Sequence, residues 1–213
     1  RETTMAKSAW APFPHPSEAF AYPGGALKTA WPRLHAGDAE PFPDTKRAQA
    51  LLDAAGKAAP KDLDAAALAS ALQDAWRAFH AGDFKIAFDA GNALGPIGAS
   101  VAVKALGIHA THLVTSEAEQ LKRYEQAATI AETAITALPG EANSHYRRAY
   151  ALGRYSQGLS IAKALKQGIA GKVRDSLHTA LELAPRHAEA HTALALYHAE
   201  IIDKIGAMIG GLT

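Results

Sequence analysis

The chain has 213 residues, of which 48% are hydrophobic, 20% are charged and none is cysteine, and its formal net charge is +1. This length fits one domain, and the lack of cysteine excludes disulfides, thiolate nucleophiles and cysteine-ligated zinc. The near-neutral charge, without a local Lys and Arg cluster, argues against a nucleic-acid partner. Charges or prolines interrupt every apolar stretch before the roughly 18 residues that a membrane span requires. Alanine dominates the apolar residues, which favours packed helices and predicts an all-α protein.

The first 44 residues contain seven of the 11 prolines. Prolines at this density are incompatible with a segment that is mainly long helix. The same segment is rich in aromatic residues, whereas disordered tails are poor in them. These are Trp10, Phe13, Phe20, Tyr22, Trp31 and Phe42. We therefore predict an extended arm over residues 1–44 that packs on a helical domain over residues 45–213.

The chain begins with Arg1 rather than Met, so we expect a trimmed or processed N-terminus that hides any signal. We take a cytoplasmic location as the default. A periplasmic location stays open, because the absence of cysteine fits both compartments.

From about residue 45 the spacing of apolar residues is typical of helices, and prolines and glycines mark their boundaries. Ser116, for example, is placed to cap a helix that ends before Pro139. The predicted helices span residues 45–57, 63–81, 83–94, 99–114, 116–138, 142–157, 160–167, 171–184 and 187–207.

The sequence contains two internal repeats, which we call echoes, and the copies of each are about 45 residues apart. Residues 26–38 match residues 71–83 at eight of 13 positions, and residues 134–139 resemble residues 180–185. Repeats of this length are typical of stacked helix pairs. The first echo makes Trp31 equivalent to Trp76 and His35 equivalent to His80. We expect the tryptophans to fix helix packing and the histidines to lie at helix C-termini, both as structural groups.

The second echo resembles the tetratricopeptide repeat. The matching residues are Ala180, Leu181, Leu183, Pro185, Ala188 and Ala190, with His191 where the family usually has tryptophan. Gly82-Asp83-Phe84 resembles the turn between the two helices of a repeat. The two copies of each echo are about 45 residues apart, which exceeds the 34 residues of that family, and residues 158–168 form the insertion.

With this insertion, residues 140–205 resemble the C-terminal half of the regulator of microtubule dynamics family and its uncharacterised bacterial relatives. The resemblance implies antiparallel helix pairs that stack as a right-handed solenoid, and we do not transfer a microtubule role from it.

The resemblance also implies a binding surface, because the first helix of each tetratricopeptide repeat lines a concave groove. Seven residues fall on this surface: Asn143, Tyr146, Tyr150, Arg154, Thr192, Leu196 and Glu200. Tyr and Arg are common at binding hot spots. Our main hypothesis is a non-enzymatic scaffold, without a cofactor, that binds a protein or peptide in this groove. Two alternatives stay open: these residues form an ordinary solvated face, or the N-terminal arm fills the groove.

The histidines support an alternative function, a helical accessory protein that binds a small ligand or a metal. His187, His191 and His198 are spaced by four and seven residues on one predicted helix, and two imidazoles at i and i+4 suit zinc. The stretch is not H-E-x-x-H, however, and His191 has a place in the repeat, so this alternative is less favoured. Neither a phosphate loop nor a G-x-S-x-G elbow is present, and we predict no enzyme.

The last residues, 205–213, are apolar and glycine-rich. A solenoid is expected to end in a polar capping helix. Either this end packs on another molecule, which includes a second copy of the chain, or the natural chain continues beyond Thr213. We favour the second interpretation.

Overall fold

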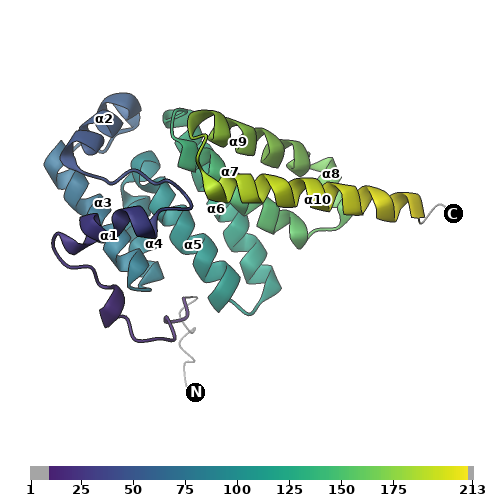
Figure 1. The fold of residues 1–213 in the computed structure, drawn as a ribbon, viewed down its shortest axis with the longest axis horizontal. Helices are drawn as coiled ribbons and strands as arrows, with labels where there is room; N and C mark the ends of the chain where they lie inside the picture. Colours follow the sequence, from purple (N-terminus) through teal and green to yellow (C-terminus); the bar gives the residue numbers. More distant parts are fainter. Residues whose placement is uncertain (1–9, 211–213) are drawn as a thin grey trace, which may run out of the picture.

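The computed structural model describes residues 10–210, with their side chains except those of Ile161 and residues 204–210. The described chain is all-helical and contains no strand (Figure 1). Its α-helices are α1 (Ala26–Leu34), α2 (Thr45–Ala55), α3 (Ala65–His80), α4 (Phe84–Ala93), α5 (Ala99–Leu113), α6 (Glu117–Ala137), α7 (Ala142–Gln157), α8 (Ile161–Lys166), α9 (Ile169–Leu183) and α10 (Ala188–Gly210). The all-α prediction is confirmed. The side chains of the apolar end at residues 205–213 lie outside this description.

The nine predicted helices correspond to α2 through α10. Short polar side chains begin several of them, as the sequence pattern indicates: Asp64 Oδ1 accepts a hydrogen bond from the Ala67 amide at 2.8 Å, and Ser116 Oγ accepts one from the Glu119 amide at 3.4 Å. The carboxylate of Glu119 accepts a hydrogen bond from Arg123. Helix boundaries therefore follow from local capping chemistry and from the positions of proline and glycine.

Helix α1 corrects the prediction of an extended N-terminal segment. It contains Pro32 in its last turn, where the missing amide removes only one hydrogen bond. Leu27 and Trp31 lie one turn apart on its buried face and are 0% and 5% exposed. The burial of this face stabilises a helix that the proline count argued against. The echo was the available signal, since the equivalent residues 71–79 were predicted to be helical.

Each of α3 to α6 packs on the helix that follows it. Helix α7 packs mainly on α9, and α9 packs on α10. Helices α3 and α5 also touch each other, as do α5 and α7. Small residues permit this close approach. A Cβ atom added to Gly98 would lie 2.1 Å from the carbonyl oxygen of Gly91, so only glycine fits where α4 meets α5.

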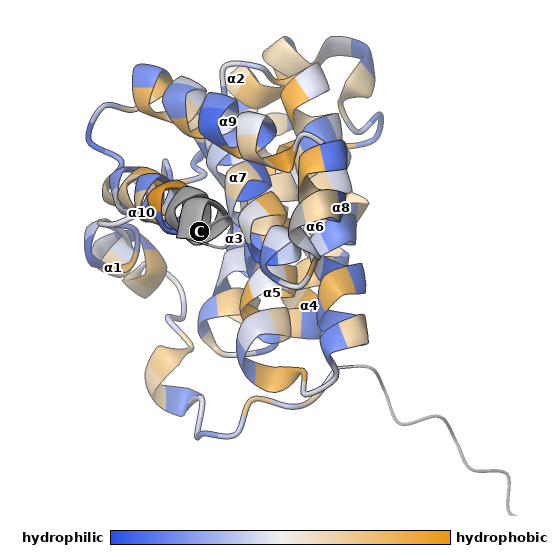
Figure 2. Ribbon diagram, turned by 90° about the vertical axis from the view of Figure 1, so that its right-hand side faces the viewer, coloured by the Kyte–Doolittle hydropathy of each residue, from blue (hydrophilic) through white to orange (hydrophobic). Residues whose placement is uncertain are grey.

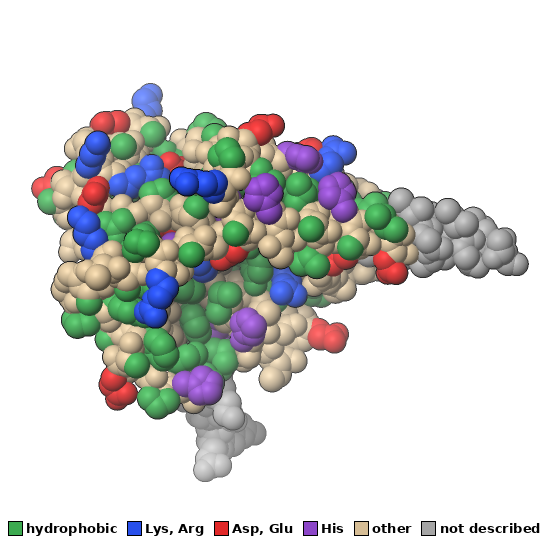
Figure 3. Space-filling view, in the orientation of Figure 1, with side chains coloured by type: hydrophobic (Ala, Val, Ile, Leu, Met, Phe, Trp, Pro, Cys, Tyr) green, Lys and Arg blue, Asp and Glu red, His purple; other side chains and the backbone are tan. Residues whose placement is uncertain are grey.

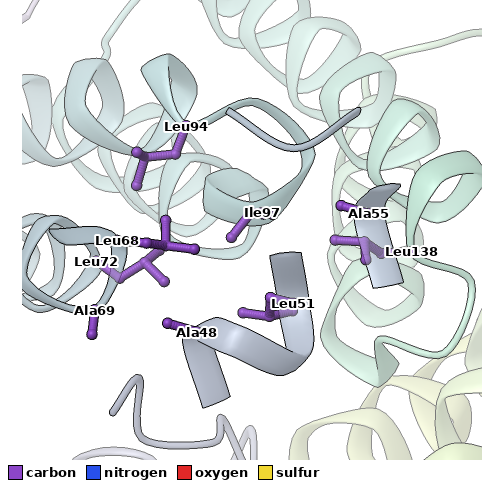
Figure 4. Close-up of a cluster of buried hydrophobic side chains, with 9 residues drawn as sticks. All are labelled: Ala48, Leu51, Ala55, Leu68, Ala69, Leu72, Leu94, Ile97 and Leu138. Carbon is purple, nitrogen blue, oxygen red and sulfur yellow. The ribbon is translucent and has the colours of Figure 1, made fainter. Parts of the chain in front are cut away.

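Buried apolar side chains join these helices in successive clusters. One cluster lies between α2 and α3 and includes Leu51, Leu68, Leu72, Ile97 and Leu138 (Figure 4). The next joins the N-terminal segment to the body, because Leu27 and Trp31 pack with Trp76 of α3 and with Val101 of α5. Trp10, Phe13, Tyr22 and Phe42 pack around its edge.

Helix α10 begins beside the end of α1 (Figure 2), where the Glu189 amide donates a hydrogen bond to the Gly37 carbonyl at 2.9 Å. It then extends past α8 and α9 (Figure 1). In the part of the chain that the structure describes, no helix has the length and apolar character needed to cross a bilayer.

Candidate functional site

The seven predicted surface residues divide into a covered group and an accessible group. Asn143 and Tyr146, near the start of α7, are 6% and 8% exposed. Tyr150 and Glu200 are half-buried, whereas Arg154, Thr192 and Leu196 are exposed. The same predicted surface is therefore closed at one end and open at the other.

The closed end is covered by the chain's own residues 37 and 38 and by the start of α10. Asn143 Nδ2 donates a hydrogen bond to the Asp38 carbonyl at 2.9 Å, and its Oδ1 accepts one from His187 Nε2 at 3.0 Å. The Tyr146 ring packs on the His187 ring with a centroid distance of 4.6 Å. Asn143 and Tyr146 thus make their contacts inside the protein.

The ring of His187 caps α10. Its Nδ1 accepts a hydrogen bond from the Ala190 amide at 3.1 Å, which places the ring hydrogen on Nε2, toward Asn143. Burial lowers the pKa of His187, and the charge of Arg147 lowers it further. The ring is therefore neutral, and both of its nitrogens are engaged.

The open end lies along the last turns of α7 and the middle of α10. Arg154 lies over the Tyr150 ring at 5.8 Å and donates a long hydrogen bond of 3.4 Å to Gln157 Oε1. Gln157 Nε2 then donates to Glu200 Oε1 at 2.9 Å, which links the two helices. Leu196 lies one turn before Glu200 and is 61% exposed. We call Arg154, Gln157, Thr192, Leu196 and Glu200 the open strip; Figure 3 shows apolar, histidine and charged side chains interspersed along α10.

A buried charge cluster at the closed end was not predicted. Its centre is Asp38, which is fully buried. One carboxylate oxygen accepts hydrogen bonds from Lys104 of α5 and, at 2.6 Å, from Arg147 of α7; the other accepts one from His35 Nδ1 at 2.9 Å. Burial alone would raise the pKa of Asp38. The His35 hydrogen bond and the two cationic charges outweigh burial and hold that pKa far below its ordinary value.

The two copies of the first echo meet beside this cluster. His35 and His80 touch through their Nε2 atoms at 3.2 Å, and Trp31 meets Trp76 edge to face at 5.6 Å. Each histidine also stacks on the tryptophan of its own copy. These contacts confirm that the tryptophans fix helix packing and that the histidines lie at helix C-termini. Burial lowers the pKa of both rings, and it lowers that of His80 to about 3.

Glu40 is the remaining titratable group of the cluster. Its side chain accepts a hydrogen bond from Ser100 Oγ at 2.6 Å, and its carbonyl accepts one from Trp31 Nε1 at 2.7 Å. Burial, helped by the charge of Asp38, raises the pKa of Glu40 to about 7. A neighbouring cavity of about 30 Å³ has room for about one water molecule. This cluster fastens the N-terminal segment to α3, α5 and α7.

The three histidines of the metal hypothesis do not converge. His187 is buried as described, His191 Nε2 donates a hydrogen bond to the Pro185 carbonyl at 2.9 Å, and His198 is exposed. Among the described residues, no group of three or more His, Cys, Asp or Glu side chains could hold a metal ion. The three histidines therefore do not form the predicted zinc site, and the small-ligand part of the alternative stays a prediction.

Comparisons with protein-family models, with curated proteins and with solved structures found no match. The resemblance to the tetratricopeptide repeat accordingly stays a prediction from the sequence.

Proposed function

We propose that this chain is a non-enzymatic scaffold whose helix pairs stack as a tetratricopeptide-like solenoid and which binds a protein or peptide partner along the open strip. One observation carries the proposal: Leu196 is exposed on a helix whose next turn is tied to α7 through Glu200, Gln157 and Arg154. This arrangement suits a partner that buries the leucine side chain and forms ion pairs with Arg154 and Glu200, which are already held in position.

The energetics agree with a binding role. Covering the exposed part of a leucine contributes roughly 1–2 kcal/mol to an association. Arg154 and Glu200 are restrained by their hydrogen bonds before any partner arrives, which reduces the side-chain entropy that binding would cost. The contacts of α3 with α5, and of α5 with α7, support the stacked arrangement.

The experiment places a photo-reactive benzoylphenylalanine at Thr192 and cross-links the protein in cells of its source. We expect discrete adducts with a partner, and we expect Leu196→Glu to reduce them by about tenfold, since a buried charge opposes binding. Ile86→Glu on α4 is the matched control, because Ile86 is also 61% exposed. Equal adduct yields for the two variants, at unchanged melting temperatures, would contradict the proposal.

A further inference from the structure

Residues 31–42 cover one end of the helical face and are held there by several separate helices. Trp31 packs on α3, Asp38 binds α5 and α7, and the Gly37 carbonyl accepts a hydrogen bond from α10. Removing this segment would free the side chain of Asn143, which the sequence placed on the binding surface, from the Asp38 carbonyl. The segment thus acts as a cover, and its attachment depends on charged groups as well as on apolar contacts.

The contact between the two histidine rings fixes the number of protons in the closed state. His35 Nδ1 donates to Asp38, so in the neutral ring Nε2 is the acceptor and His80 Nε2 donates to it. Only one hydrogen atom fits between two nitrogen atoms 3.2 Å apart. Protonating both rings would place two N–H groups and two positive charges against each other away from water, where charge repulsion is strong.

Asp38 favours protonation of both rings, but burial and the nearby cationic groups outweigh it. The other titratable and charged groups that act on the pair are Tyr22 and Asp38 of the N-terminal segment, Lys104 of α5 and Arg147 of α7. Behind them, Glu189 of α10 acts on Lys104 and Arg147, and Glu40 acts on Arg147. The single negative charge of Asp38 is shared between Lys104 and Arg147, so the three groups together remain positive and oppose a further cation at His35.

We propose that residues 31–42 form a proton-sensitive closure, which opens when His35 and His80 both become protonated and then exposes the covered end of α7. This inference does not depend on the proposed function, because opening can be measured without any partner. It adds a regulated second surface beside the open strip.

The direction of the pH effect follows from proton binding. Both histidine pKa values are lowered in the closed state from the ordinary 6.5, so opening takes up two protons as the pH falls below that value. Glu40 opposes this effect, because its pKa of about 7 means that opening releases its proton. The net uptake of about one proton raises the open fraction by about tenfold per pH unit.

The test uses the absence of cysteine from the chain. Leu27→Cys introduces a thiol on the buried face of α1, one turn before Trp31 and in the same cluster, so release of Trp31 from α3 should expose it. Leu177→Cys introduces one on α9, away from the cover; both leucines are 0% exposed. A pyridyl disulfide, which labels thiols in acid as well as at neutral pH, reports exposure of each. We expect labelling at position 27, relative to position 177, to rise about tenfold between about pH 6 and about pH 5. A parallel rise at both positions means global unfolding and overturns the proposal.

Histidine variants identify the sensor. His80→Gln keeps a hydrogen-bond donor but cannot be protonated, so the relative rise should fall below about twofold; the exposed His112→Gln should retain it. A full rise in His80→Gln overturns the proposal. If this variant is already open at neutral pH, ring NMR of the histidines in the unsubstituted chain decides. The proposal is supported if His35 and His80 become protonated at the same pH at which Trp31 Nε1 loses its hydrogen bond to the Glu40 carbonyl. It is overturned if both rings become protonated while that hydrogen bond stays intact.

Discussion

Residues 26–38 and 71–83 have nearly the same sequence, yet their last residue has opposite environments. In both copies the leucine and the tryptophan are buried: Leu27 matches Leu72, and Trp31 matches Trp76. Asp38, however, is fully buried in a charge cluster, whereas the equivalent Asp83 is exposed at the start of α4. The shared apolar residues dictate the helix, while the function of the aspartate depends on what lies opposite it.

The largest expected difference between the copies concerns these aspartates. Asp38→Asn should lower the free energy of unfolding by about 3–5 kcal/mol, because it removes the buried carboxylate that Lys104 and Arg147 share and leaves only the more distant Glu189, 3.8 Å from Arg147. Asp83→Asn should change it by less than about 0.5 kcal/mol. Urea denaturation of the two variants measures both values. Equal losses would mean that the burial of Asp38 has no energetic consequence.

The leucines should behave alike. Leu27→Ala and Leu72→Ala each remove a buried side chain, at 0% and 4% exposure, and should each cost about 3 kcal/mol. Calorimetric melting of the two variants tests this expectation. A much smaller loss for Leu27→Ala would show that α1 adds little to the stability of the folded chain.

The glycines of the two copies should differ by a smaller amount. Gly82 has a φ of +86°, and an added Cβ atom would lie 2.4 Å from the Phe13 ring, so Gly82→Ala should cost about 1–3 kcal/mol. At Gly37 the nearest atom is the end of the flexible Glu189 side chain, at 2.9 Å, and Gly37→Ala should cost less than about 1 kcal/mol. Chemical denaturation decides, and a reversed order would contradict the described turn geometries.

The smallest expected effect is a dependence of stability on pH. It concerns Glu40 and Lys85, which lie two positions after Asp38 and Asp83. The pKa of Glu40 is raised from 4.5 to about 7 in the folded chain, so its stabilising contribution is complete below 4.5 and is lost as the pH rises through 7. Between about pH 6 and about pH 7, the free energy of unfolding of Glu40→Gln should therefore rise by about 1 kcal/mol relative to that of the unsubstituted chain. Lys85→Gln on the exposed surface is the control, and a flat difference for Glu40→Gln would refute the assignment.

The sequence predicts the helices better than it predicts the contacts between them. Helices α2 to α10 follow from capping residues and from the positions of proline and glycine, which act locally. Helix α1 was missed because the proline count was given more weight than the echo. The pairing of Asp38 with Lys104 and Arg147 joins residues 66 and 109 positions apart, and no spacing rule predicts such a contact. Only part of the predicted binding surface is accessible, because long-range contacts with Asp38 and His187 cover Asn143 and Tyr146.

The bond between the Gly37 carbonyl and the Glu189 amide has a consequence for the order of folding. During synthesis residues 26–42 leave the ribosome well before α10, so their contact with α10 has to wait until Glu189 has been made. Until Trp76 and Arg147 are also in place, Leu27 and Trp31 have no buried site to occupy. Closure of this long-range contact is therefore a late step, and the unprotected apolar segment is the part of the nascent chain most exposed to misassembly.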